Sequence, residues 1–237
     1  MKKSSSTPNC SGCPCRLISV FTTLEKEEIA IVEKNKSCIE IKKGERIFEQ
    51  GEFPRGLFVV NKGKLKVVRT GSEGKEQIVH LAKDGDIMGY RAILGHDKYS
   101  CSGIALENSI LCFIPSEIFI SLIEKNGKLA LNIIKLFSNE LKEAEKNIAN
   151  IAQKSVRERM AQTLLLIKGT YGFEADKKTL NVKITRDDFA GIAGTTRETA
   201  TRVLQDFFEE KIIDLKEKKI KIINDSKLLE TAKFFDK

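Results

Sequence analysis

The chain has 237 residues, of which 41% are hydrophobic and 31% are charged, and it carries a formal net charge of +8. This balance indicates a globular protein of one large or two modest domains and excludes an intrinsically disordered chain. The positive charge suits a partner rich in phosphate groups, and no apolar run reaches the roughly 18 residues of a membrane span. We expect a cytoplasmic protein outside the membrane, because cysteines interrupt the stretch where a signal peptide needs an apolar core.

Residues 1–20 form a short polar arm that contains three closely spaced cysteines, Cys10, Cys13 and Cys15. Three more cysteines follow at Cys38, Cys101 and Cys112. In a chain without a secretory signal, clustered cysteines indicate metal-binding thiolates or a redox centre before they indicate structural disulfides. The arm is therefore a candidate site.

Residues 21–125 have the pattern of a β-rich domain. A short helix is predicted from Phe21 to about Asn35, where apolar residues alternate irregularly with charged ones. From Cys38 to about Pro115, brief apolar runs are separated by turns that contain glycine, which is typical of an antiparallel roll or barrel. The predicted strands include Arg46–Phe48, Leu57–Val60, Leu65–Val68, Gln77–Leu81 and Ile110–Ile114.

A long helix is predicted over residues 126–155, in a helical stretch that begins near Ser116 and has few breakers after Gly127. Its apolar residues recur at steps of three and four: Ile133, Leu136, Phe137, Leu141, Ala144, Ile148 and Ile151. Such a stripe either packs on its own domain or pairs with its copy in a second chain as a coiled coil. The order of a roll followed by a long helix favours a homodimer.

Residues 156–237 form the last predicted domain, which begins with a helix over Met160–Ile167 and a break at Gly169–Gly172. Near its end, the apolar runs Ile212–Leu215 and Ile220–Ile223 flank a polar turn, Lys216–Lys219. Two short strands around such a turn are typical of the wing of a winged helix-turn-helix. The charge of this domain does not by itself locate a site, because its 17 basic residues face 14 acidic ones.

Two helices joined by a tight turn are predicted between residues 184 and 204. Thr185 and Asp188 have the spacing of a capping box, which begins a helix. Gly194 ends that helix, because glycine accepts the left-handed conformation that a tight turn requires. Thr195 or Thr196 then caps the second helix.

The second of these helices has two different faces. Ala200, Val203, Leu204 and Phe207 share the apolar face, whereas Arg197, Glu198, Thr201 and Arg202 share the opposite one. Arginine can bond guanine O6 and N7 with both arms of its guanidinium, and glutamate can accept from cytosine N4. The alternative is an ordinary helical hairpin with a solvated charged face. The wing, the tight turn and the paired arginines favour a helix that enters the major groove of DNA.

The whole chain resembles the Crp/Fnr family of transcription regulators. The resemblance rests on four segments in their order and spacing: Lys42–Gly51, Leu57–Gly63, Gly85–Gly89 and Ile184–Arg202. It implies an α+β fold with an antiparallel, cyclic-nucleotide-binding-like β-roll, a long dimerisation helix and a winged helix-turn-helix. It also implies a homodimer that binds palindromic double-stranded DNA and contacts RNA polymerase.

By this resemblance, the predicted DNA contacts lie on and before the second helix. Arg197, Glu198 and Arg202 would read base edges, and Thr185 and Arg186 would touch phosphate. Thr196 and Thr201 complete the predicted DNA-binding set. The Arg-Glu-x-x-x-Arg arrangement resembles the cAMP-responsive branch, which implies a site similar to TGTGA-N6-TCACA. The redox-sensing branch usually lacks the first arginine, so the chain departs from it there.

The resemblance does not extend to the residues that hold a cyclic nucleotide. Members that bind cAMP have a Gly-Glu pair and an Arg-Ser/Thr step, where this chain has Gly89-Tyr90 and Tyr99-Ser100. Without that arginine, a buried phosphate has no bidentate partner and its desolvation is not compensated. We therefore do not expect cAMP to be the effector.

The cysteines indicate a different effector by resemblance to the oxygen sensor Fnr. Cys10, Cys13, Cys15 and Cys112 would be the four thiolate ligands of a 4Fe-4S cluster. The single residue between Cys13 and Cys15 departs from the wider spacing in Fnr, which leaves open that Cys38 or Cys101 replaces an arm ligand. Zinc, a thiol–disulfide switch or a different effector in the roll are the alternatives.

An enzyme is not expected, because the chain has two histidines and lacks a phosphate-binding loop and the motifs of common hydrolases. A cyclic-nucleotide-type regulatory subunit that does not bind DNA is the remaining alternative. Such a subunit would share the roll but would not need Arg197 and Arg202 on a capped helix.

Overall fold

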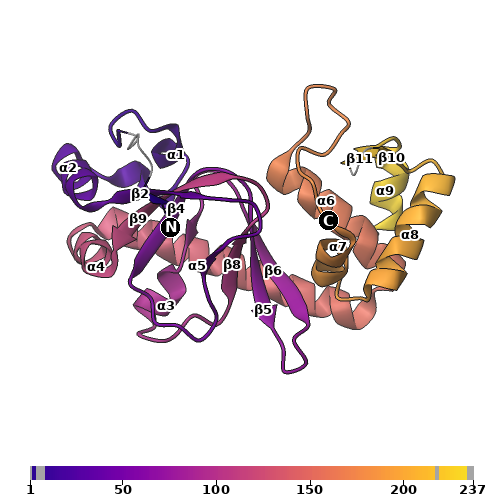
Figure 1. The fold of residues 1–237 in the computed structure, drawn as a ribbon, viewed down its shortest axis with the longest axis horizontal. Helices are drawn as coiled ribbons and strands as arrows, with labels where there is room; N and C mark the ends of the chain where they lie inside the picture. The colour runs from indigo at the N-terminus through magenta and orange to yellow at the C-terminus, as the bar shows by residue number, and fades with distance from the viewer. Residues whose placement is uncertain (1, 4–8, 217–218, 234–237) are drawn as a thin grey trace. The chain divides into compact units, whose positions relative to one another are not determined.

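The computed structural model describes residues 2–3, 9–216 and 219–233, and the chain divides into two compact units. One unit comprises residues 1–74 and 80–141, and the other comprises residues 75–79 and 142–237. Figure 1 shows strands and short helices in the first and mostly helices in the second. The four-part division expected from the sequence, with boundaries after residues 20, 125 and 155, stays a prediction.

Two sheets form the roll, with strand orders β1-β2-β9-β4-β7 and β3-β8-β5-β6. The strands are β1 (Lys2–Lys3), β2 (Ser37–Ile41), β3 (Arg46–Phe48), β4 (Gly56–Lys62), β5 (Leu65–Thr70), β6 (Glu76–Ala82), β7 (Ile87–Met88), β8 (Ser102–Ala105) and β9 (Ser109–Pro115). All five segments predicted as strands are confirmed. The sequence pattern did not name β1, β2, β7 or β8. β7 has only two residues, and β8 is buried along its whole length and shows no alternation.

Short helices surround the roll: α1 (Pro14–Leu17), the 3-10 helix η1 (Val20–Thr23), α2 (Lys26–Asn35), α3 (Tyr90–Leu94) and α4 (Ser116–Lys125). One core cluster joins η1, α2 and α4 to the sheet and includes Phe21, Phe119, Cys38 and Cys112. A second cluster fills the inside of the roll, where the ring centroids of Phe48 and Tyr99 lie 4.5 Å apart. The predicted helix after Phe21 is therefore two elements, η1 and α2.

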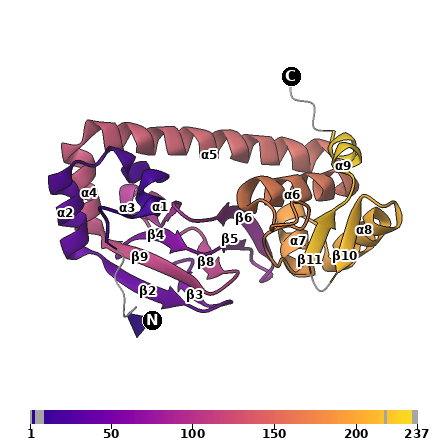
Figure 2. The ribbon, with the colours of Figure 1, turned by 90° about the horizontal axis from the view of Figure 1, so that it is seen from above.

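The long helix α5 (Gly127–Gln153) is a separate element from α4, because the chain leaves helical geometry at Asn126. Figure 2 shows α5 as one continuous helix. Its predicted stripe divides: Ile133 is buried in the core of the roll and Leu136 packs against that core. Leu141, Ile148 and Ile151 are exposed. Part of the stripe thus packs on its own domain, and the exposed part is left for the second alternative, pairing with another copy.

The second unit contains α6 (Val156–Tyr171), α7 (Arg186–Ala193), α8 (Arg197–Glu209), β10 (Ile213–Lys216), β11 (Lys219–Ile222) and α9 (Asp225–Thr231). The predicted break at Gly169–Gly172 falls at the end of this range, because α6 continues through Gly169 and is capped by Gly172, whose φ is 68°. Its core contains Phe189, Phe207, Leu164 and Met160. No helix among the described residues combines the length and apolar character needed to cross a bilayer.

Candidate functional site

The turn between α7 and α8 has the predicted geometry. The Thr185 hydroxyl accepts from the Asp188 amide at 3.1 Å, and the Asp188 carboxylate accepts from the Thr185 amide at 3.0 Å, which completes the capping box. α7 ends at Gly194, whose φ of 62° and ψ of 52° are left-handed. The amide of Thr195 then bonds the carbonyl of Ala190 at 3.0 Å. These local interactions set the direction in which α8 begins.

Helix α8 begins at Thr196, whose hydroxyl accepts from the Thr199 amide at 3.3 Å, so Thr196 rather than Thr195 is the cap. The predicted apolar face is confirmed, since Ala200, Val203, Leu204 and Phe207 are all buried. The opposite face is exposed and consists of Arg197, Glu198, Thr201 and Arg202. α8 therefore presents two arginines and a glutamate to solvent within its first two turns.

The remaining predicted DNA contacts lie at the start of α7 and α8. Thr185 and Thr196 are exposed, and Arg186 is half-buried. Arg197 lies 3.6 Å from Asp187, with both side chains about two-thirds exposed, at 65% and 66%. An ion pair this exposed contributes little, so Arg197 remains available to another anion. DNA contact by these residues stays a prediction.

Arg159 of α6 holds the same turn in place and was not predicted. Its Nε donates to the Ala193 carbonyl at 2.8 Å, and a terminal nitrogen donates to the Gly194 carbonyl at 3.1 Å. These carbonyls lie at the C-terminal end of α7, where main-chain acceptors lack helical partners. The sequence contains no signal for this contact, because its partners are main-chain atoms 34 and 35 residues away.

The wing is confirmed in part. β10 and β11 pair antiparallel from Ile213 opposite Ile222 to Lys216 opposite Lys219. Each strand lies one residue from its predicted position. Within the predicted turn, Glu217 and Lys218 lie outside the described residues.

The four predicted cluster ligands, Cys10, Cys13, Cys15 and Cys112, all line one cavity of about 50 Å³. Lys36 Nζ donates to Cys10 Sγ at 2.9 Å. Asn61 contacts the other two arm thiols. Its side-chain amide donates to Cys13 Sγ at 3.4 Å, and its main-chain carbonyl accepts from Cys15 Sγ at 2.7 Å. The arm thus reaches the roll through its thiols.

Cys112 has a second sulfur beside it. Cys38 on β2 is directly opposite Cys112 on β9, and the two Sγ atoms lie 3.2 Å apart. Cys101 does not line the cavity. Of the two alternative ligands considered from the sequence, only Cys38 is adjacent to a predicted ligand.

Burial raises the pKa of two of the predicted ligands, Cys15 and Cys112. Desolvation, with the neighbouring Cys13 and Asp84 as smaller causes, raises the pKa of Cys15 to about 11. Desolvation and the contact with Cys38 also raise the pKa of Cys112. A metal binds cysteine as thiolate, so metal binding here would displace protons and depend on pH.

The donor set fits an iron–sulfur cluster in kind and number, since four cysteines line a common cavity. Their present positions do not yet form a metal site, because no three His, Cys, Asp or Glu side chains among the described residues are arranged to hold a metal ion. Ligation would require Cys10, Cys13 and Cys15 to exchange their Lys36 and Asn61 partners for the metal. The part of the chain that would have to move is the arm, which ends in the short helices α1 and η1.

The two tyrosines that stand in place of the cyclic-nucleotide motif residues have side-chain partners of their own. Tyr99 is buried and its ring packs on Phe48 inside the roll. Tyr90 donates its hydroxyl to Glu140 of α5, and Arg91 Nε donates to the same carboxylate at 2.9 Å. This packing favours an effector other than a cyclic nucleotide.

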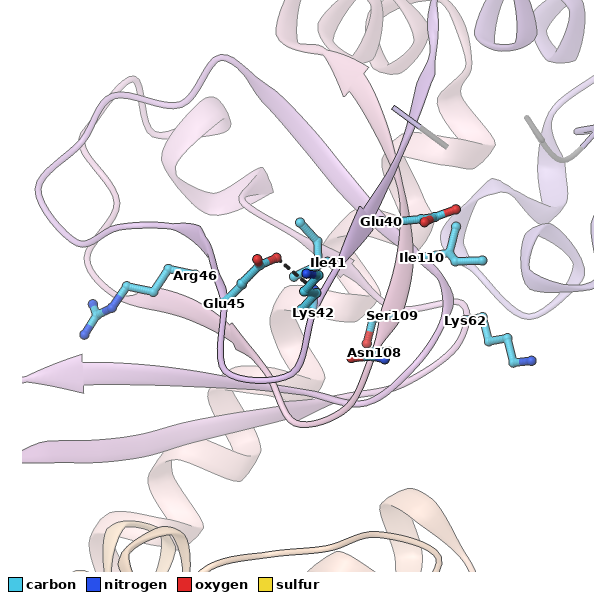
Figure 3. Close-up of a pocket in the computed structure, with 9 residues that line it drawn as sticks. All are labelled: Glu40, Ile41, Lys42, Glu45, Arg46, Lys62, Asn108, Ser109 and Ile110. Carbon is cyan, nitrogen blue, oxygen red and sulfur yellow. Dashed lines mark hydrogen bonds between the residues drawn. The ribbon is translucent and has the colours of Figure 1, made fainter. Parts of the chain in front are cut away.

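A separate surface groove of about 690 Å³ lies between β2, β9 and the loops at their ends (Figure 3). Its lining contains both charge signs: Glu40, Ile41, Lys42, Glu45, Arg46, Lys62, Asn108, Ser109 and Ile110. Figure 3 shows Arg46 and Lys62 pointing away from each other at opposite ends. Because its polar groups do not converge, we assign it no ligand.

Each of the two units contains a segment that matches a known protein family. Residues 38–126 match the family model of the cyclic nucleotide-binding domain, and residues 158–231 match that of the Crp-like helix-turn-helix domain. The fumarate and nitrate reduction regulatory protein of Vibrio cholerae is 32% identical over 231 residues, which are 94% of this chain and 90% of that protein. Electron transport regulator A of Shewanella oneidensis is 31% identical over 227 residues, 93% of this chain and 88% of that protein.

The fold also matches solved structures. A structure from Eubacterium rectale, described as a transcriptional regulator of the Crp/Fnr family, superposes with a TM-score of 0.73 at 24% identity. The match covers 90% of this chain and 97% of that one. At this identity the likeness concerns the fold alone, and it confirms the predicted roll, long helix and helix-turn-helix.

Proposed function

Because the chain belongs to the Crp/Fnr family of transcription regulators, we propose that it is a redox- or oxygen-responsive regulator that binds a palindromic DNA site as a homodimer. Members of this family bind DNA and are not enzymes, which confirms those two predictions. The observation that carries the proposal is the exposed face of α8, with Arg197, Glu198 and Arg202 on it.

Three features of α8 support its role in reading base edges. Its apolar face is buried, so the polar face cannot rotate inward without exposing Phe207 and Leu204. The cap at Thr196 places Arg197 and Glu198 in the first turn, the part of a recognition helix that enters the major groove. Glu198 is the acceptor that cytosine requires, and the arginines supply the bidentate donors that guanine requires. These residues suit a TGTGA-N6-TCACA site.

The exposed stripe of α5 supports dimerisation. Ile134, Leu141 and Ile148 are spaced by sevens and are 60–69% exposed. Phe137, Ala144 and Ile151 follow each of them by three residues and are exposed as well. This is the a/d pattern of a coiled coil, which buries such a stripe against a second copy. Two reading helices of a dimer on one palindrome lie about 34 Å apart, one turn of DNA.

The cysteine cavity supports the sensing function. Cys10, Cys13, Cys15 and Cys112 would hold a 4Fe-4S cluster, with Cys38 as the alternative ligand. When bound, such a cluster supplies a redox centre that oxygen destroys if it is accessible to solvent. The relatives from Vibrio cholerae and Shewanella oneidensis carry names that refer to reduction and electron transport, which agrees with redox control.

One hydrophobic core connects the cysteines with α5. Cys112, Leu129 and Ile133 belong to the same buried cluster, and Cys10 packs against it. At the last residue of the arm, the main-chain carbonyl of Val20 accepts from the Asn132 side chain of α5 at 3.1 Å. These contacts give a shift of the arm a direct route to the helix that bears the dimer stripe.

A DNA-binding measurement tests the reading face. We expect the wild-type protein to shift a TGTGA-N6-TCACA duplex, and Arg202→Ala to weaken binding by about 10- to 100-fold because one bidentate contact is lost. Lys128→Ala removes the same charge from an exposed position in α5 and should leave specific binding unchanged. Binding that does not respond to Arg202→Ala would disprove the proposed reading helix.

Anaerobic purification tests the sensing part. We expect iron, acid-labile sulfide and visible absorption in the wild type and in Cys101→Ser, and loss of all three in Cys112→Ser. A colourless, iron-free wild type prepared without air would rule out the cluster. Zinc in place of iron would identify the alternative thiolate site.

A further inference from the structure

Cys38 and Cys112 form a pair that the proposed function uses only in part. They are directly opposite each other on the neighbouring antiparallel strands β2 and β9, and their sulfurs lie 3.2 Å apart. Cys112 is a predicted cluster ligand. Cys38 is only 3% exposed, and among the described contacts its one predicted ligand neighbour is Cys112. Their separation is suited to chemistry between the two sulfurs.

We propose that Cys38 and Cys112 are an oxidation site, at which hydrogen peroxide converts the two thiols into a reversible cross-strand disulfide. The two strands already bring the α-carbons within reach of each other, because residues directly opposite in an antiparallel pair have Cα atoms about 4.5–5.5 Å apart. A disulfide requires a Cα separation of about 4.4–6.8 Å. The bond forms if the sulfurs approach by about 1.2 Å, which rotation of the side chains supplies.

Access gives the two cysteines different roles. Cys112 lines the cavity of about 50 Å³, and Cys38 does not. Because about 10–15 Å³ of such volume holds one water, the cavity has room for a small oxidant such as hydrogen peroxide, whereas oxidised glutathione is far larger. Peroxide therefore meets Cys112 first, and Cys38 is the thiol that completes the reaction.

The reaction is balanced in two steps. As Cys112 Sγ attacks one oxygen of hydrogen peroxide, its thiol proton passes to the departing oxygen and the O–O bond breaks, so that a cysteine sulfenic acid and one water form. Cys38 Sγ then attacks Cys112 Sγ, the S–O bond breaks, and a second water leaves. Overall, two thiols lose two electrons and two protons, and hydrogen peroxide becomes two waters. A dithiol reductant reverses the change by thiol–disulfide exchange.

The disulfide and a metal compete for the same sulfur. A sulfur atom in a disulfide is not a thiolate and cannot be a ligand, so oxidation removes Cys112 from the metal site. This consequence rests on the proposed function, but formation of the disulfide does not. The arm cysteines do not need to take part, because their thiols contact Lys36 and Asn61.

Peptide mapping of the full chain tests the disulfide. Reduced, metal-free protein is exposed to hydrogen peroxide, its free thiols are blocked with N-ethylmaleimide, and the digest is analysed by mass spectrometry. We expect a peptide that links Cys38 to Cys112, sensitive to dithiothreitol, in the wild type and in Cys101→Ser. The variant with Cys10, Cys13 and Cys15 all changed to serine should form the same link. Blocked thiols at both Cys38 and Cys112, or a link from Cys112 to the arm, would refute the proposal.

A second variant tests the order of the two steps. With Cys38→Ser in the background that has Cys10, Cys13 and Cys15 changed to serine, or Cys38→Ala if the serine variant does not fold, the sulfenic acid on Cys112 has neither the thiol opposite it nor an arm thiol to react with. Trapping with dimedone should then label Cys112 about ten-fold more than in the same background with Cys38 retained. Equal labelling in both proteins would show that Cys38 does not resolve the intermediate.

Iron uptake tests the competition separately. Reduced and peroxide-treated samples are reconstituted with iron and sulfide without reductant. We expect about ten-fold less cluster in the treated sample and recovery after dithiothreitol. Equal uptake by a sample whose Cys38–Cys112 link is verified by mapping would disprove the competition. Failure of the reduced sample to bind iron would instead disprove the proposed function and leave the mapping result intact.

Discussion

The helix-turn-helix and the cysteine cavity differ in how their residues are distributed along the chain. The cap, turn and exposed face of the first lie between Thr185 and Arg202. The cavity combines the arm with Lys36, Asn61 and Cys112, which are far apart in sequence. A contiguous site follows from helical periodicity and capping, whereas an assembled site depends on strand register. Substitutions and reactivity measurements in each region test that difference.

Phe207 and Phe208 give the sharpest test of the contiguous site, because they are adjacent in sequence but differ in burial. Phe207 is fully buried and Phe208 is 40% exposed. We expect Phe207→Ala to lower the free energy of unfolding by about 3–5 kcal/mol, as a cavity forms beneath α8. Phe208→Ala should change it by about 0.5 kcal/mol or less. Similar losses in urea denaturation of both variants would show that periodicity does not determine the buried face.

Cys15 tests the assembled site through its reactivity. Burial disfavours the thiolate and raises the pKa of Cys15 from 9.0 to about 11. Alkylation by iodoacetamide should therefore continue to accelerate up to about pH 11 in the folded protein, and level off near pH 9 after denaturation. The sign follows from the charge, since the buried form is the neutral thiol. A native profile that levels off near pH 9 would show that the arm does not bury Cys15.

Arg159 tests whether the contiguous site is as local as its sequence suggests. Arg159→Met leaves the Ala193 and Gly194 carbonyls without their donor, and we expect a loss of about 2 kcal/mol in unfolding free energy. Lys168→Met serves as the control, because it removes an exposed ion pair with Asp225 that contributes about 0.5 kcal/mol. Equal losses of stability in thermal denaturation of the two variants would mean that the turn does not depend on the Arg159 side chain of α6.

Thr185 gives the smallest effect and the most local one. Thr185→Ala removes the capping hydroxyl and should cost about 1 kcal/mol, whereas Thr185→Ser should retain most of the stability. Unfolding is measured without DNA, so that the predicted phosphate contact does not contribute. A loss of the same size in Thr185→Ser would show that the methyl group rather than the hydroxyl stabilises the start of α7.

Most of the fold was predictable because each element has a local signal. Five strands, the long helix and the helix-turn-helix follow from periodicity, glycine turns and caps at Thr185 and Thr196. Gly169 shows the limit of such signals, since glycine permits a break but α6 continues through it. β8 was missed because it is buried along its whole length, which removes the alternation of a half-exposed strand.

The candidate sites were predictable to different extents for the same reason. The exposed face of α8 follows from a 3.6-residue period, and the structure places each of its residues as expected. The four cysteines could be grouped only by resemblance. That Cys38 lies beside Cys112 depends on the register of β2 against β9, and that Lys36 contacts Cys10 depends on where the arm docks. Neither has a signal in the sequence near those residues.

The two-sided use of α5 has a thermodynamic consequence. Leu129 and Ile133 belong to the core that contains Cys112. Ile134, Leu141 and Ile148 are exposed and are the residues proposed to pack against a second chain. Linkage between binding events is reciprocal: if the state of the cysteines alters how the helices associate, association must alter the cysteines by the same factor. If the proposed dimer binds a palindromic operator, that DNA would by the same linkage alter the reactivity of the thiols. In a cell, the regulator bound at its promoter and the regulator free in solution would respond to the same oxidant differently.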